Sequence, residues 1–244
     1  MDETSTAVLE RPPFSYEPTP KELELEHNET SRLQRIKGSP RVWYVEIKND
    51  GSGIFKSRFY KEKIISDTQN ERAAYIISRV LGLNFVPTTV LRTVDGQEGA
   101  LQEFIEDAEF IYEVEQTPRI KDGLYKFWIF GHIIRNMDRH DDNLLIKEGQ
   151  VLSIDHEGSF DPDFQNSSDF DDFRHYYGEQ APGDLVEIFK EFKEDGTRQE
   201  ALRSTLQGLI ESEDIEITMR RIEGVGRILI EKGRIDSKEE LAIS

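Results

Sequence analysis

A short β-hairpin predicted in the middle of the chain constrains the fold more than any other segment, because polar residues flank its base. Its arms are two apolar runs, residues 144–147 and 151–154, separated by the glycine-containing turn 148–150. Pairing of the arms brings Asn143, at the entrance of the first, beside Asp155, at the exit of the second. The sequence therefore predicts that an amide and a carboxylate lie together at one end of the hairpin.

Asn143 and Asp155 carry the oxygen ligands that suit Mg²⁺, which takes few protein ligands and relies on substrate phosphates for the rest. Asp138 lies just upstream and could face an acceptor hydroxyl while the other two hold the metal. An apolar stretch with helical spacing precedes this segment. The order of helix, loop, hairpin and aspartate indicates a phosphoryl-transfer site, although Asp, Asn and Gly taken singly are equally typical of ordinary turns.

Asp138-Arg139-x-x-x-Asn143, followed about a dozen residues later by Ile154-Asp155, resembles a known signature. It is similar to that of the phosphatidylinositol 3- and 4-kinases, including the type II 4-kinases, and of the HipA-type and secretory-pathway protein kinases. The resemblance implies an α+β, two-lobed protein-kinase-like fold, in which an N-terminal antiparallel sheet with one helix precedes a mainly helical C-terminal lobe. The two lobes would close over ATP with Mg²⁺ or Mn²⁺.

The resemblance also assigns roles within the motif. Asn143 and Asp155 would bind the metal, and Asp138 would position or deprotonate the acceptor hydroxyl. His140 is the alternative candidate for that role, as in the lipid kinases. Arg139 is expected to be structural, tying the loop to a neighbouring carboxylate.

The upstream sequence supplies the other half of such a site. Residues 41–48 alternate apolar and polar side chains, as a strand does, and after a glycine-rich turn a second strand, residues 54–59, carries Lys56. The resemblance places Lys56 where a strand lysine pairs with the phosphates of ATP. Its ordinary alternative is a solvated strand lysine.

A helix beginning at Asp67 or Thr68 and ending at Gly82 is predicted next. Glu71 falls in its first turn, where it could reach a lysine on the neighbouring strand, or simply interact favourably with the helix dipole. The apolar positions of this helix form one stripe, Ala73, Ala74, Ile77, Val80 and Leu81.

Two further strands, 82–92 and 101–107, are expected to lead into the hinge between the lobes. In the families that this chain resembles, the hinge recognises adenine through backbone groups, so Glu103, Phe104 and Ile105 are candidates by position.

The loop that covers the phosphates is less defined, because no G-x-G-x-x-G occurs. Gly38 and Ser39 are the candidates, in a turn that could equally be an ordinary one. After Asp155, the glycine that usually follows two positions later arrives as Gly158, one position late, which leaves the conformation of the following segment open.

Length and composition bound the organisation of the chain. The 244 residues suit one kinase-like catalytic domain over 31–244, with lobes at about 31–105 and 106–244. Residues 1–30 are rich in Glu, Pro, Ser and Thr and are expected to form a flexible arm. The acidic start is unlike a secretory leader, no apolar run approaches bilayer length, and cysteine is absent, so a cytoplasmic location is expected.

The net charge of −18 opposes binding to nucleic acid and to anionic membranes. The acidic segment 161–172 follows Asp155, where substrate-recognition segments lie in such kinases, and would favour a basic protein over a phosphoinositide. No H-E-x-x-H zinc motif or nucleophile elbow is present. The remaining third predicts core helices at 184–192, 199–210 and 215–231.

Three classes of function are therefore open. The first is an atypical kinase that transfers the γ-phosphate of ATP to a protein Ser/Thr. The second is a phosphatidylinositol or small-molecule kinase, suggested by the closeness of the motif to lipid kinases. The third is an AMP transferase or a non-catalytic nucleotide-binding module on the same fold, although the signature positions are all filled. The oligomeric state is left undetermined.

Overall fold

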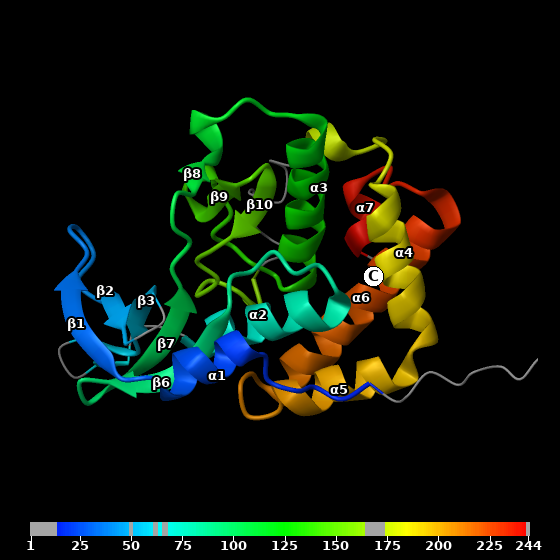
Figure 1. The fold of residues 1–244 in the computed structure, drawn as a ribbon. Helices are drawn as coiled ribbons and strands as arrows, with labels where there is room; N and C mark the ends of the chain where they lie inside the picture. The colour runs from blue at the N-terminus through cyan, green and yellow to red at the C-terminus, as the bar shows by residue number, and fades with distance from the viewer. Residues whose placement is uncertain (1–13, 49–50, 61–62, 65–67, 164–173, 243–244) are drawn as a thin grey trace, which may run out of the picture.

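A five-stranded antiparallel sheet, in the order β1-β2-β3-β7-β6, forms the N-terminal lobe of the computed structural model (Figure 1). The structure describes residues 14–48, 51–60, 63–64, 68–163 and 174–242. The strands are β1 Thr30–Arg35, β2 Val42–Ile47, β3 Ser52–Ser57, β6 Thr89–Val94 and β7 Gln97–Glu103, with a small β4–β5 hairpin at Phe59–Tyr60 and Lys63–Ile64. Apolar residues on one face pack into a core, Val45, Ile47, Phe55, Val90, Val94 and Leu101.

The N-terminal region corrects the expectation of a flexible arm. Residues 14–28 are described, and α1, Pro20–His27, packs against β6 (Figure 1). Thr19 and Glu22 form a capping box, which satisfies two free N–H groups at the helix start. Leu25 is fully buried in the core of the sheet. Burial of this face orders a segment whose composition alone suggests disorder, while residues 1–13 lie outside the described part of the chain.

Truncation of Leu25 tests this docking. We expect Leu25→Ala to lower the free energy of unfolding by about 2–5 kcal/mol, because it leaves a cavity under the sheet. Leu23, on the same helix, is 44% exposed. Leu23→Ala should therefore change stability by less than about 0.5 kcal/mol. Urea denaturation of both variants gives the comparison, and equal effects would contradict the packing of α1.

Helix α2, Thr68–Leu81, joins the two lobes: it lies against β6 and β7 of the sheet, and its apolar stripe packs into the helical core. The predicted stripe residues are all buried. The C-terminal lobe contains α3 Pro118–Ile133, α4 Gly183–Glu194, α5 Gly196–Leu206, α6 Ser212–Lys232 and α7 Lys238–Ala242. The two-lobed α+β architecture is confirmed, and no helix in the described ranges is both long and apolar enough to cross a membrane.

The central hairpin is present in a small sheet, β10-β9-β8, with strands Leu144–Lys147 (β9), Gln150–Ser153 (β10) and Glu109–Phe110 (β8). Its turn has two residues, Glu148 and Gly149, at φ 52° and 74°, so β10 begins earlier than predicted. Left-handed residues at both positions match the twist of the flanking strands.

Three other strands also differ from the prediction, and β7 is Gln97–Glu103 where 101–107 was expected. β3 begins at Ser52, inside the predicted turn. β6 begins only at Thr89, because the N–H groups of Phe85 and Val86 donate to the hydroxyl of Ser78 at the end of α2 instead of to a strand.

Candidate active site

Three charged residues predicted by the sequence meet between the lobes. Lys56 on β3 contacts the carboxylate of Glu71 in the first turn of α2, and its Nζ lies 2.8 Å from Oδ1 of Asp155, just after β10. Lys56 is 8% exposed and Glu71 1% exposed. The sheet, the helix and the hairpin thus each contribute one member of a largely buried ion cluster.

Electrostatic effects keep Lys56 and Asp155 charged. Burial alone would lower the pKa of Lys56, but the carboxylates of Glu71 and Asp155 raise it above its ordinary value. Burial alone would raise the pKa of Asp155, but the charge of Lys56 and its hydrogen bond lower it. At neutral pH the lysine is therefore protonated and Asp155 is ionised.

The end of the hairpin has the predicted arrangement around Asn143 and Asp155. The N–H of Ile154 donates to the carbonyl of Asn143 (3.0 Å), and Asp155 has a left-handed φ of 62°. The Asn143 side chain is buried, and its amide nitrogen donates to the carbonyl of Asp138 (2.9 Å). This hydrogen bond leaves the amide oxygen as the atom that could bind a cation.

Asp138 and His140 lie together in the loop before β9. Oδ1 of Asp138 is 3.1 Å from Nε2 of His140, and both side chains are about half exposed. The loop is held by Asn136, whose side-chain oxygen accepts from the N–H of Asp138 (2.8 Å), and by Gly158, whose carbonyl accepts from Met137. Both candidates for positioning an acceptor hydroxyl are therefore accessible from solvent, and their contact could orient the imidazole.

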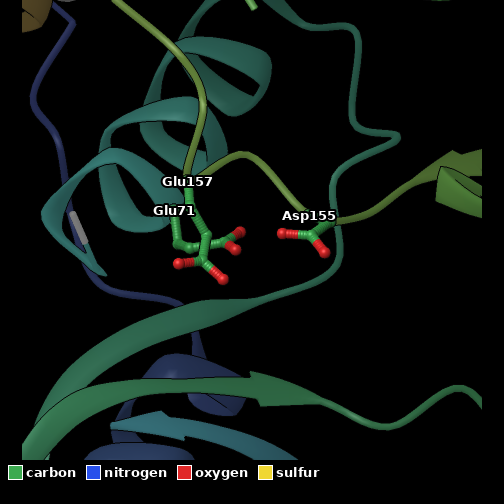
Figure 2. Close-up of side chains that lie close together, drawn as sticks. All are labelled: Glu71, Asp155 and Glu157. Carbon is green, nitrogen blue, oxygen red and sulfur yellow. The ribbon is translucent and has the colours of Figure 1, made fainter. Parts of the chain in front are cut away.

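Glu157 is a further acidic residue of the site, which the sequence analysis did not single out. Glu71, Asp155 and Glu157 have carboxylate oxygens within 4.8 Å of one another, and Figure 2 shows the Glu71 and Asp155 carboxylates directed toward each other. Arg41 pairs with Glu157 at 3.1 Å. The signal in the sequence is the spacing of Glu157, two residues after Asp155.

These donors fit a divalent cation. One oxygen of Glu71 and one of Asp155 accept from Lys56, whereas Oε2 of Glu71 is buried and has no hydrogen-bond partner among the described residues. A buried carboxylate oxygen without a donor favours a positive ligand. Asp155 and Asn143 could supply the two predicted oxygen ligands, and Glu71 and Glu157 have carboxylates close to Asp155.

Asn70 ties α2 to the segment after Asp155. Its amide nitrogen donates to the carbonyls of Glu157 and Ser159, both at 2.9 Å. This contact was not predicted from the sequence, and it fixes the start of α2 relative to Asp155. The position of Glu71 therefore depends on both lobes.

The three hinge candidates differ in their backbone partners. The N–H of Glu103 donates to Thr88 (2.8 Å) and that of Phe104 to Ser52 (3.1 Å). Because the N–H groups of Glu103 and Phe104 already donate to these carbonyls, Ile105 carries the N–H group that remains a candidate for adenine, while all three carbonyls remain possible acceptors.

Gly38 and Ser39 lie in the loop that joins β1 to β2. Strand β1 was not predicted from the sequence. Because β1 pairs with β2 at the edge of the sheet, the loop between them is a hairpin loop. Gly38 has a φ of 91°, in the region that favours glycine.

Arg139 and the acidic segment complete the predicted set. Arg139 is buried against Gly131, where a Cβ would come within 2.4 Å of Arg139 Cδ. Residues 164–173, most of the acidic segment, lie outside the described residues.

His132 predicts a pH dependence of stability. It is buried on α3, where Nη1 of Arg221 lies 3.1 Å from its Nε2, and burial followed by the charges of Arg221 and Arg139 lowers its pKa well below 6.5. Below pH 6.5 the unfolded chain takes up a proton that the folded chain does not. The free energy of unfolding should therefore fall with decreasing pH, by up to about 1.4 kcal/mol per pH unit from this residue.

Urea denaturation between pH 7.5 and 5 measures this slope. His132→Gln should reduce it, whereas His27→Gln, an exposed substitution on α1, should retain it. An unchanged slope in His132→Gln would contradict a neutral His132.

Comparisons with known proteins agree with this geometry. Residues 122–219, which include the Asp138 loop and Asp155, match the family model of phosphatidylinositol 3- and 4-kinase. A search of curated protein sequences gave no significant match.

Three solved structures share the fold. A Golgi casein kinase is 12% identical, with a TM-score of 0.59, covering 88% of this chain and 78% of its own. Hydra Fam20 with sugar is 15% identical, with a TM-score of 0.61, covering 86% of each chain. The Helicobacter pylori proinflammatory kinase CtkA is 13% identical, with a TM-score of 0.50, covering 91% of this chain and 99% of its own. The family model thus matches the segment that carries the Asp138 loop and Asp155, and the three solved structures share the fold of this chain.

Proposed function

We propose that this protein transfers the γ-phosphate of ATP to the hydroxyl of a protein serine or threonine. The observation that carries the proposal is the contact of Lys56 with both Glu71 and Asp155. A strand lysine held by a helix glutamate, next to a carboxylate at the end of a hairpin, is the arrangement that kinases use to position the phosphates.

Each residue has a distinct role in this proposal. Lys56 orients the phosphates and Glu71 holds Lys56, while Asn143 and Asp155 hold Mg²⁺ or Mn²⁺, which neutralises phosphate charge when bound. The backbone of residue Ile105 faces adenine, and the loop with Gly38 and Ser39 covers the phosphates. Asp138 positions the acceptor hydroxyl, and His140, in contact with it, is placed to take up the proton.

A protein acceptor is favoured by charge. At −18, the chain repels anionic vesicles and attracts basic proteins. One structural neighbour is named a casein kinase, and its Mn/ADP complex supports the use of a nucleotide with a divalent metal.

The lack of cysteine fits the cytoplasmic location expected from the sequence.

A phosphatidylinositol acceptor is the second candidate, because the matching family is that of phosphatidylinositol 3- and 4-kinases. Incubation with γ-labelled and α-labelled ATP and either Mg²⁺ or Mn²⁺ separates the candidates. A basic protein mixture and phosphatidylinositol vesicles serve as acceptors across a salt series, and intact mass distinguishes phosphate from AMP adducts on the chain itself.

We expect γ-label on protein, decreasing as salt screens the attraction. Faster labelling of vesicles than of any protein would favour the lipid kinase. Transfer of the α-label would indicate AMP transfer. A melting temperature that does not change when ATP and metal are added would indicate that this site binds no nucleotide.

A further inference from the structure

Glu22, on α1, is a buried residue outside the proposed site. Its carboxylate lies against α2. It is 1% exposed, and its oxygens lie 2.7 Å from Arg72 and 2.5 Å from Arg79. The hydroxyl of Tyr16 (2.7 Å) and the N–H of Thr19 (2.9 Å) also donate to it. Four donors from two segments thus converge on one carboxylate.

This environment keeps Glu22 ionised. Burial alone would raise its pKa, but the hydrogen bonds from Thr19 and Tyr16, together with the charge of Arg72, lower it below its ordinary value. Arg72 and Arg79 are seven residues apart, two turns along the same face of α2. A single negative charge therefore bridges two turns of the helix that carries Glu71.

Residues 14–27, which we term the N-terminal brace, also reach beyond α2. The N–H of Phe14 donates to the hydroxyl of Thr197 on α5 (2.8 Å). At its other end, Arg92 on β6 donates to the carbonyl of Leu25 (2.6 Å). Figure 1 shows this blue segment running from α1 toward α5. The brace therefore links the sheet, α2 and the helical lobe.

The two faces of α2 make different contacts. Asn70 and Glu71 face the site, where they bind the segment after Asp155 and Lys56. Arg72, the next residue, contacts the brace and donates to the carbonyl of Thr89 on β6 (2.5 Å). Because α1 packs against β6, the ion pairs of Glu22 with Arg72 and Arg79 oppose a shift of α2 away from the sheet that carries Lys56.

We propose that Glu22 is a positioning residue for phosphoryl transfer, which holds α2 where Glu71 meets Lys56. This inference rests on the proposed function of the site. Without the charge of Glu22, Arg72 and Arg79 lose their shared partner, α2 samples displaced positions, and Lys56 spends less time oriented toward the phosphates. We therefore expect weaker binding of ATP and unchanged binding of the acceptor.

Glu22→Gln removes the charge at nearly constant size, and Glu26→Gln, an exposed substitution on the same helix, is the matched control. We expect hydrogen exchange of α2 amides to become about tenfold faster in Glu22→Gln, with α6 amides unchanged. The KM for ATP in phosphoryl transfer to a basic protein should rise about tenfold, while the KM for the acceptor stays the same. Binding of a fluorescent ATP analogue should weaken in parallel, and Glu26→Gln should match the wild type throughout.

Unchanged α2 exchange in folded Glu22→Gln would overturn the proposal. Faster exchange with an unchanged KM for ATP and unchanged analogue binding would overturn it as well, because Glu22 would then stabilise α2 without positioning the site. If Glu22→Gln does not fold, Arg79→Gln, which removes one of the two arginine partners of Glu22, tests the proposal by the same measurements. A wild type that binds the analogue but labels no acceptor would refute the proposed function, whereas exchange and analogue binding would still decide the role of Glu22.

Discussion

Asp155→Asn is expected to lower the rate of phosphoryl transfer by at least about 10²–10³-fold while leaving the protein folded. The substitution removes a negative charge from the predicted metal site, and charge neutralisation and positioning dominate phosphoryl transfer. Lys56 keeps its contact with Glu71 in this variant, so the buried carboxylate on α2 retains its cation.

Initial rates with γ-labelled ATP, measured beside circular dichroism and melting temperature, test this expectation. Asp122→Asn removes one charge from an exposed position on α3 and is the matched control. Raising the Mg²⁺ or Mn²⁺ concentration should restore part of the activity if the loss reflects weaker metal binding. Near-normal turnover in folded Asp155→Asn would refute the assignment of this site.

Lys56→Met is expected both to abolish phosphoryl transfer and to destabilise the fold by about 3–5 kcal/mol. It leaves Glu71, which is 1% exposed, without its cation in a largely buried position. Lys48, by comparison, pairs with Glu29 at 2.7 Å on the surface, with side chains 59% and 78% exposed. Lys48→Met should therefore leave the stability nearly unchanged.

The double variant Lys56→Met/Glu71→Gln separates the two effects. Removing the second charge should recover most of the lost stability, because no uncompensated charge then remains on α2, yet activity should stay absent. Urea denaturation of the wild type, Lys56→Met, Glu71→Gln and the double variant gives the coupling energy between Lys56 and Glu71. Equal destabilisation by Lys56→Met and Lys48→Met would mean that the buried pair contributes no more than a surface one.

The sequence by itself determined the features of this protein that depend on local pattern. Alternating side chains on β2, the apolar stripe of α2 and the turn at Gly149 each follow from interactions between residues close in the chain. The order of these elements along the chain then predicted that Lys56, Glu71, Asn143 and Asp155 share one site. Periodicity alone predicts helices and strands, but it does not say which of them meet; the resemblance of the motif order to that of known kinases supplied this information.

Tertiary structure alone decided which of these elements dock together and which polar residues become buried partners. Helix α1 has eight mainly polar residues, and short helices are marginal in water, so its order depends on docking Leu25 and Glu22. Arg41 and Glu157 are 116 residues apart and meet because the sheet and the hairpin close on each other. Such pairings arise from the packing of whole elements, and a polar side chain becomes a buried partner only once that packing removes its water.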